Sequence, residues 1–254
     1  MAEKKRDALH SLAKDIVFEA TVLKHIHEIR TNGFTVIENY YSADRCENIK
    51  NDINAFQVNH PLQTDFSPGV NDVKIWAGEK KISSITPFYA DPLLLAIANC
   101  YLNYPTINYT TQTNCYTPNA VDPEKGAEWH RDSEFEKQIK AIMYLSDVGP
   151  DNAPYAYIAN SHRISNVTDT AGLFEKKTDF PHLELLKYLE GKRKLTLKTL
   201  TAKAGSVILT DTMGIHRRSP IRAGSRHTLT NYYVGEHRKS DFDAVFSAII
   251  KKFN

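Results

Sequence analysis

The first third of the chain alternates apolar and polar residues with a helical period. One face of a helix predicted over residues 1–30 carries the apolar side chains of Leu9, Leu12, Ile16, Leu23 and Ile26. Gly33 provides a stop signal for this helix. The apolar run FTVIENYY then predicts a short strand, and a second amphipathic helix begins at Ser42, a residue type that caps helix N-termini. These elements indicate an α-rich layer at the start of the chain.

Between residues 57 and 85 neither a helical nor a strand period is clear. Proline and glycine punctuate this segment, which predicts a long loop with one strand around residues 74–76. The next helix is expected to start after Asp91, a capping residue, with Pro92 in the first helical position. The pattern therefore predicts a break in regular structure between the second helix and the third.

Short runs rich in β-branched and aromatic residues dominate from residue 106 onward. Runs such as TINYTTQTNCY, QIKAIMYLSDV and GSVILTD are separated by turn signals, and about seven strands of this kind are typical of an antiparallel sandwich or barrel. One helix, FPHLELLKYLEG, interrupts them. We expect a mainly β fold with flanking helices in a single domain. Its parts would be a helical layer over about 1–105, a β core over about 106–236 and a C-terminal helix over about 240–253 of residues 1–254.

Composition and charge argue against several classes of protein. Hydrophobic residues make up 41% and charged residues 24% of the 254 residues, as in ordinary globular proteins. The net charge of +2 comes without a clustered basic face, so we expect no nucleic-acid partner. The longest apolar run, LLLAIA, is too short to cross a bilayer, so we expect no membrane association. Three cysteines without a CxxC pair, and a start without a signal sequence, favour a reducing, cytoplasmic location.

The segment AEWHRDSEF puts chemically active side chains on a predicted strand. Alternate residues of a strand point to the same face, so His130 and Asp132 should project together while Trp129 and Arg131 face away. An imidazole beside a carboxylate forms two-thirds of the 2-His-1-carboxylate set that holds non-haem Fe(II) and leaves coordination positions open. His216, which follows a later predicted strand, is the best candidate for the third ligand.

An arginine completes the candidate site. Arg226 lies ten residues after His216 at the start of the last predicted strand, and the turn between them would lay that strand beside the segment of His216. A guanidinium at the floor of the pocket could grip a carboxylate through two hydrogen bonds. With a metal, this set describes a site for 2-oxoglutarate, a dicarboxylate that can chelate iron at one end and pair with arginine at the other.

These motifs resemble those of the phytanoyl-CoA dioxygenase (PhyH) family of Fe(II)- and 2-oxoglutarate-dependent oxygenases. The segments WHRD, YLSDVGPDNAPYAYIANSHR, AGSVILTDTMGIHRRS and SRHTLTNYYV follow the family's order and spacing. The segment NGFTVIENYYSADRCENIKNDI is similar to the family's usual opening. The resemblance covers roughly residues 32–236, and it implies a double-stranded β-helix (jelly-roll, cupin-like barrel) core.

Residue by residue, the resemblance implies a complete site for metal and co-substrate. The implied iron ligands are His130, Asp132 and His216. Arg226 would anchor 2-oxoglutarate, and Gln112 and Asn114 match positions that contact 2-oxoglutarate in some relatives.

Two departures from the family pattern are visible. This chain has ANSHR over residues 159–163 where the family often has PGSHR, so that turn is built without its proline and glycine. Family members often carry a small hydroxyl residue two positions after the last ligand histidine. Here that position is Arg218, with Ser219 one residue later, so the position itself does not supply the hydroxyl.

The implied function is a dioxygenase that uses Fe(II), 2-oxoglutarate and O2. The expected reaction is hydroxylation of a small-molecule or natural-product substrate, with release of succinate and CO2. Relatives that halogenate lack the ligand carboxylate, so Asp132 favours hydroxylation, desaturation or ring formation. No pattern in the sequence specifies an oligomeric state.

Three alternatives stay open at this point. The chain could be a jelly-roll binding protein that keeps the ligands without turnover. It could be a zinc-dependent hydrolase that uses the same three ligands, with Glu128 or Glu134 as general base. It could also be an oxygenase that acts on nucleic acid, which the lack of a basic groove disfavours.

Overall fold

The fold is described from a computed structural model. The structure describes residues 2–67, 69, 71–119, 127–133, 136–170, 186 and 195–253. The helix predicted over FPHLELLKYLEG lies, apart from Leu186, outside the described residues.

A seven-stranded antiparallel sheet forms the larger part of the β core. In spatial order its strands are β1 (Phe34–Ile37), β8 (Val207–Asp211), β5 (Ile139–Tyr144), β10 (Arg226–Gly235), β4 (Thr106–Tyr116), β3 (Asp72–Ile75) and β2 (Asp65–Ser67). β10 pairs with β4 on one side and β5 on the other, and every one of its residues is buried. A strand covered on both faces shows no alternation of apolar and polar residues, and RHTLTNYYVG is such a run.

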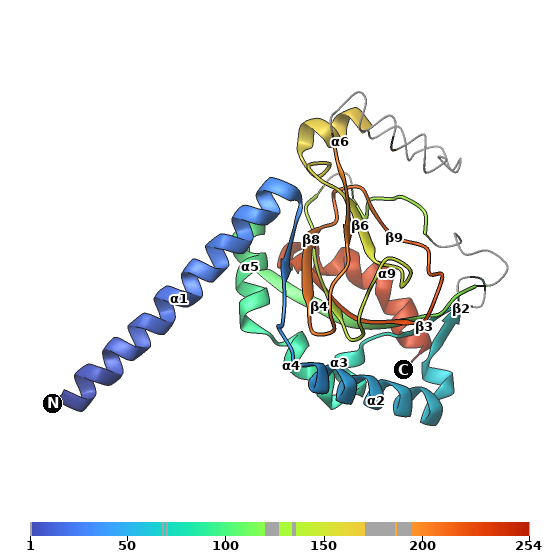
Figure 1. The fold of residues 1–254 in the computed structure, drawn as a ribbon, viewed down its shortest axis with the longest axis horizontal. Helices are drawn as coiled ribbons and strands as arrows, with labels where there is room; N and C mark the ends of the chain where they lie inside the picture. Colours follow the sequence, from blue (N-terminus) through green and yellow to red (C-terminus); the bar gives the residue numbers. More distant parts are fainter. Residues whose placement is uncertain are drawn as a thin grey trace.

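A second antiparallel sheet of three strands completes the core (Figure 1). Its order is β7 (Leu197–Leu200), β6 (Tyr155–Ile158) and β9 (His216–Arg218). Strands β4 to β10 all follow residue 106, as the sequence predicts. The predicted mainly β architecture with flanking helices is confirmed.

The first helix, α1 (Ala2–Asn32), packs against α5 (Pro92–Leu102) and β1, while its N-terminal part extends away from the body of the protein (Figure 1). It ends before Gly33, as predicted, and that glycine takes a φ of +93°. The predicted apolar face is wrong at Leu23, which is exposed. In the part of the helix whose side chains are described, residues 17–32, the buried residues are Val22, His25, Ile26 and Ile29. The predicted Leu9, Leu12 and Ile16 lie outside that part.

Capping residues start the next helices where the sequence predicts them. The Ser42 side chain accepts a hydrogen bond from the backbone of Arg45 at the start of α2 (Ala43–Asn59). The Asp91 side chain accepts from the backbone of Leu93 and Leu94 at the start of α5. Both helices bury their apolar stripe in the main core cluster, which also takes in the outer face of the larger sheet.

The segment predicted as a long loop, residues 57–85, is instead largely regular. It contains η1 (Pro61–Gln63), β2, β3, α3 (Gly78–Lys81) and η2 (Ser83–Ile85), and α4 (Thr86–Tyr89) follows. β3 matches the strand predicted around residues 74–76, whereas the other elements, of three or four residues each, are too short for a period to appear in the sequence. Tertiary contacts hold them: Ile75 and Ile85 are fully buried, and the Glu79 carboxylate accepts a hydrogen bond from the backbone of Thr111 at 2.9 Å.

The C-terminal helix α9 (Lys239–Lys252) follows η3 (Glu236–Arg238), and α6 (Ile164–Thr170) follows β6. The Phe246 ring on α9 lies 5.7 Å from the rings of Trp76 and Tyr232 and 5.9 Å from that of Tyr109. α9 is therefore attached to the larger sheet near β3, β4 and β10. Within the described part of the chain, no helix combines the length and apolar composition that a membrane span requires.

Candidate functional site

The three predicted metal ligands lie together where the two chain segments of the WHRD and GIHRR motifs meet. His130 and His216 form an antiparallel bridge in which each backbone N–H donates to the other's carbonyl at 3.0 Å. The backbone N–H of Asp132 donates to the carbonyl of Thr212, also at 3.0 Å. The strand predicted for this segment is thus reduced to a single bridge, yet the side chains still alternate. Trp129 is buried on the other side, where the Arg217 guanidinium lies 4.8 Å from its ring.

The donor atoms of this triad converge on one point. Nε2 of His130 and Nε2 of His216 each lie 3.8 Å from Oδ1 of Asp132, and all three donor atoms fall within 4.8 Å of one another. Donor atoms bound to one ion at about 2.1 Å lie no more than about 4.2 Å apart. The triad is close to a metal-binding arrangement in its present form.

Hydrogen bonds to the backbone fix which nitrogen of each histidine faces the centre. Nδ1 of His130 bonds the carbonyl of Glu128 at 3.0 Å, and Nδ1 of His216 bonds that of Gly214 at 2.9 Å. Each Nδ1 therefore carries the proton, and each Nε2 keeps its lone pair for a metal. Burial, together with the neighbouring His130, lowers the pKa of His216 to about 3, so this imidazole stays neutral. The His130 side chain is 51% exposed, so solvent reaches the triad from its side.

The carboxylate of Asp132 is held by a lysine that sequence reasoning missed. Lys140 Nζ lies 2.7 Å from Oδ2 of Asp132, which leaves Oδ1 facing the histidines. Burial alone would raise the pKa of Asp132, but Lys140 and the two histidines lower it well below its ordinary value. The signal in the sequence is a lysine inside the apolar strand QIKAIMYL, because a charge placed in a core strand requires a partner.

The triad opens onto a cavity of about 300 Å³ inside the barrel, here called the inner cavity. Its walls come from the inward-facing residues of β3, β4, β5, β6, β9 and β10. The predicted site residues that line it are His130, His216, Arg226, Gln112 and Asn114. Residues that line it and were not predicted include Lys74, Tyr116, Lys140, Tyr155 and Tyr232.

Arg226 is buried at the start of β10, and not all of its hydrogen-bond donors are used by described residues. One terminal nitrogen donates to the carbonyl of Ala153 at 2.6 Å, while Nε has no partner among the described residues. The guanidinium carbon lies 5.1 Å from the ring of Tyr144 and 5.7 Å from that of Tyr116. These aromatic faces stabilise a cation in a buried position and fix its plane.

The two polar residues predicted on β4 differ in their engagement. Gln112 accepts a hydrogen bond from the Tyr232 hydroxyl at 2.5 Å through Oε1. The amide nitrogen of Asn114 donates to both oxygens of Asp72, at 3.2 and 3.3 Å, and to the hydroxyl of Tyr116 at 3.2 Å. Asn114 therefore contributes to the wall chiefly by holding Asp72.

The two departures from the family pattern have structural explanations. Asn160 has a φ of +67°, so an asparagine takes the left-handed conformation that glycine would supply in PGSHR. Arg218 lies on β9 two residues after His216, on the same face of the strand, and it lines the inner cavity. Its guanidinium carbon lies 4.7 Å from the ring of Tyr116. A cation thus stands where relatives carry a hydroxyl.

A comparison of sequences finds one family. The sequence profile of the family described as Phytanoyl-CoA dioxygenase (PhyH) matches residues 29–228. No curated protein sequence matches the chain at a significant level.

Solved structures share the fold at low sequence identity. The epimerase SnoN from nogalamycin biosynthesis, an alpha ketoglutarate dependent non-heme protein, has a TM-score of 0.66 at 12% identity, covering 85% of this chain and 84% of that chain. HygX from Streptomyces hygroscopicus, with nickel and 2-oxoglutarate bound, has a TM-score of 0.59 at 17% identity, covering 84% and 87%. EctD from S. alaskensis, with 2-oxoglutarate and 5-hydroxyectoine, has a TM-score of 0.63 at 20% identity, covering 84% and 75%. Oxygenases of this kind have a jelly-roll core, so the predicted double-stranded β-helix is confirmed.

Proposed function

The chain belongs to the phytanoyl-CoA dioxygenase (PhyH) family and is therefore an iron- and 2-oxoglutarate-dependent oxygenase, and we propose which of its residues bind the metal and the co-substrate. His130, Asp132 and His216 hold Fe(II), and Arg226 anchors the distal carboxylate of 2-oxoglutarate. The observation that carries this proposal is the geometry of the triad. Nε2 of His130 and Nε2 of His216 each lie 3.8 Å from Oδ1 of Asp132, and both histidines line the cavity that the buried Arg226 also lines.

The charges of the inner cavity support a dianionic co-substrate. Among the described residues that line it, Lys74, Lys140, Arg218 and Arg226 are cations and none is a carboxylate. Lys74 and Lys140 are each paired with an aspartate just beyond the wall, at 3.1 and 2.7 Å. The guanidinium of Arg226 keeps an unpartnered Nε among the described groups, which suits a carboxylate oxygen.

The chain's own residues orient the reaction rather than perform its redox step. Bound iron and 2-oxoglutarate would supply the oxidising power, converting a substrate R–H, O2 and 2-oxoglutarate into R–OH, succinate and CO2. Lys140 restricts Asp132 to one inward oxygen, and the two Nδ1 hydrogen bonds keep the histidine rings in place. Asp132 also occupies the position that a halide would need, which favours hydroxylation, desaturation or ring formation over halogenation.

We propose a small-molecule substrate of the natural-product type. Two of the structural neighbours support this, since HygX was solved with hygromycin B and SnoN with nogalamycin RO. HygX is 18% and SnoN 13% identical to this chain, so the likeness concerns the fold and does not identify the individual substrate.

An anaerobic titration with Fe(II) and 2-oxoglutarate tests the assignment. The wild type should develop the visible metal-to-ligand charge-transfer band of the chelate, and His130→Ala should lose it. Arg226→Ala should need far more 2-oxoglutarate to reach the same band. Arg222→Ala, which removes an exposed arginine from the turn before β10, is the matched control and should behave as the wild type. No band in any protein with reduced iron would reject the site and favour zinc or a binding role.

A further inference from the structure

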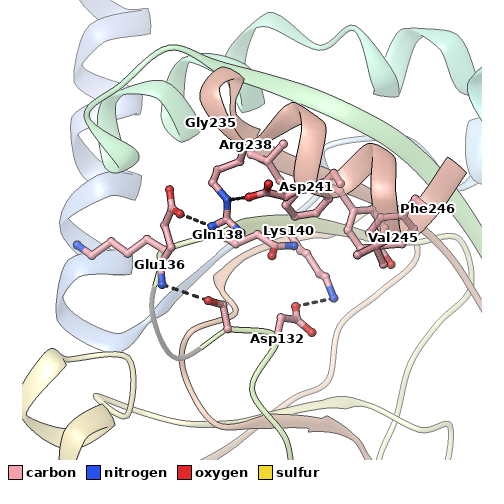
Figure 2. A pocket seen from close by; sticks show the side chains of 14 residues that line it. Asp132, Glu136, Gln138, Lys140, Gly235, Arg238, Asp241, Val245 and Phe246 are labelled. Atoms are coloured by element: carbon pink, nitrogen blue, oxygen red, sulfur yellow. Dashed lines mark hydrogen bonds and ion pairs between the residues drawn. The ribbon is translucent and has the colours of Figure 1, made fainter.

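A second cavity of about 310 Å³ lies between α9 and the ends of β5 and β10, here called the helix cavity (Figure 2). Lys140 and Tyr232 line both this cavity and the inner cavity. Asp132 lines the helix cavity, whereas His130 and His216 line the inner cavity. The triad therefore stands at the boundary, and a metal held there would lie next to both spaces.

The two cavities differ in charge. Among the described residues, three carboxylates and three cations line the helix cavity, so their formal charges cancel: Asp132, Glu136 and Asp241 against Lys137, Lys140 and Arg238. Arg238 forms ion pairs with Glu136 and Asp241, and Lys140 pairs with Asp132, as Figure 2 shows. Because these groups already neutralise one another, the helix cavity offers no excess charge to a ligand. The inner cavity, by contrast, is lined by Arg218 and Arg226, together with Lys74 and Lys140, which pair with Asp72 and Asp132; no carboxylate is among its described lining residues.

The rest of the helix-cavity wall is apolar and aromatic. It includes Tyr232, Val234, Phe242, Val245 and Phe246. The rings of Phe242 and Phe246 stack 5.7 Å apart with 10° between their planes, and the Val245 side chain is 62% exposed. Aromatic walls favour flat rings that can pack in offset or edge-to-face contacts.

The wall that α9 contributes lies beyond the segment that the family profile matches. The PhyH profile ends at residue 228, while α9 covers Lys239–Lys252. Side chains of α9 line the same cavity as Asp132.

We propose that the helix cavity binds the prime substrate and selects for an uncharged part that carries an aromatic or other flat ring. This assignment rests on the proposed function, because it takes the inner cavity as the place of 2-oxoglutarate. The charges of the two cavities assign the ligands: the dianion 2-oxoglutarate binds in the inner cavity, which is lined by cations, and the neutral ring of the substrate binds in the helix cavity. Lys140 and Tyr232, which line both cavities, form the wall between them.

The test uses 2-naphthol, a neutral ring probe, with the full chain loaded with Mn(II) and 2-oxoglutarate. Paramagnetic broadening of the probe's proton NMR lines reports binding close to the metal. Val245→Trp fills the helix cavity and should weaken binding at least tenfold. Val58→Trp is the matched control, because Val58 is 79% exposed on α2 and lines neither cavity; it should bind the probe as the wild type does.

A second probe separates the two cavities. The anion 2-naphthoate should bind more weakly than 2-naphthol while 2-oxoglutarate is present. Absence of metal-dependent broadening by 2-naphthol, equal binding to Val245→Trp, or preference for the anion would each overturn the proposal. The charge-transfer band of the Fe(II) protein is recorded in parallel. If that band forms but the probe fails to bind, only the substrate site is wrong; if the band is absent, the proposed function fails as well.

Discussion

Lys140 Nζ contacts Oδ2 of Asp132 at 2.7 Å, while Oδ1 of the same carboxylate faces the two histidines at 3.8 Å. Both side chains are largely buried, with exposures of 16% for Lys140 and 19% for Asp132. A carboxylate whose second oxygen is engaged offers a metal one oxygen in a fixed direction. We predict that Lys140→Met lowers the affinity for Fe(II) by about 10–100-fold, the usual cost of losing a partner behind a metal ligand. Anaerobic competition with a chelator measures this affinity.

A second lysine in the same cavity provides the control for Lys140→Met. Lys74 pairs with Asp72 at 3.1 Å and does not touch the triad. Lys74→Met removes the same charge from the same cavity, so it should leave iron affinity close to that of the wild type. An equal loss in both variants would mean that the overall field of the cavity, rather than the contact with Asp132, controls metal binding.

Arg218 should contribute to co-substrate affinity. Its side chain shares a strand face with His216 and lines the inner cavity, in the position where relatives carry a hydroxyl. Hydrogen bonds to charged groups contribute about 1.5–3 kcal/mol, so Arg218→Ser should raise the dissociation constant of 2-oxoglutarate about tenfold or more. The measurement is the 2-oxoglutarate dependence of the charge-transfer band at saturating Fe(II).

The neighbouring Arg217 is the control for Arg218. It lies on the opposite face of β9, where its guanidinium packs 4.8 Å from the ring of Trp129. Arg217→Ser should leave 2-oxoglutarate affinity unchanged, although it removes the same charge one residue away. If Arg218→Ser and Arg217→Ser bind 2-oxoglutarate equally well, Arg218 has no part in holding the co-substrate.

The sequence predicted the parts of this site that depend on spacing along one strand. His130 and Asp132 project together because alternate residues share a face, even though only a single bridge forms there. Arg226 lines the same cavity as His216, but the predicted placement of the last strand beside the His216 segment is wrong. β10 pairs with β4 and β5 in the larger sheet, whereas β9, which holds His216, pairs with β6 in the other sheet. Nor did anything in the sequence pair Lys140 with Asp132, since that contact depends on how β5 lies against the WHRD segment.

Short elements and helix docking escaped prediction for a physical reason. The strand predicted around residues 74–76 is found as β3, but the four-residue helix α3 was missed, because its position follows from tertiary contacts such as that of Glu79 with β4. On α1 the predicted Ile26 is buried, but Leu23, also expected in the core, is exposed and Val22 is buried in its place. The position of Phe246 against Trp76 could not be foreseen either, because a helical period fixes which residues share a face and not which surface they meet.

Gly214 should be intolerant of a side chain. A Cβ at Gly214 would lie 1.7 Å from the hydroxyl oxygen of Tyr157, which is fully buried and donates to the carbonyl of Asp211 at 2.8 Å. The Gly214 carbonyl also orients Nδ1 of His216. We predict that Gly214→Ala lowers the free energy of unfolding by roughly 1–3 kcal/mol, as overpacking does, and weakens iron binding. Urea denaturation and chelator competition measure the two effects.

Gly149 provides a matched site for the same substitution. A Cβ there would meet only the side-chain oxygen of Asn152, at 3.3 Å. Gly149→Ala should therefore change both the unfolding free energy and iron affinity much less than Gly214→Ala. Wild-type iron affinity in Gly214→Ala would show that the Gly214 backbone does not position His216.

Asp211 should make the stability of the protein fall as pH rises. Burial raises the pKa of this carboxyl from its ordinary 3.8 to about 6, although the Tyr101 hydroxyl and the Met213 backbone N–H donate to it at 2.6 and 2.9 Å and partly offset the shift. Between pH 4 and 6 the folded protein keeps a proton that the unfolded chain has released. The stabilising contribution is therefore complete below about pH 4 and is lost as pH rises through 6.

Asp211→Asn keeps the site neutral at every pH and removes this dependence. In urea denaturation of the metal-free protein, the wild type should lose about 3 kcal/mol relative to Asp211→Asn between pH 4 and pH 7, the value of a shift of about two pKa units. Asp147→Asn is the control. The Lys203 ammonium lowers the pKa of the exposed Asp147, so the contribution of Asp147 to stability is lost as pH falls and not as pH rises. If the difference between wild type and Asp211→Asn is flat across this range, the buried carboxyl is not protonated in the folded state, and Lys137 and Arg131, which favour its charged form, stabilise it more than burial opposes it.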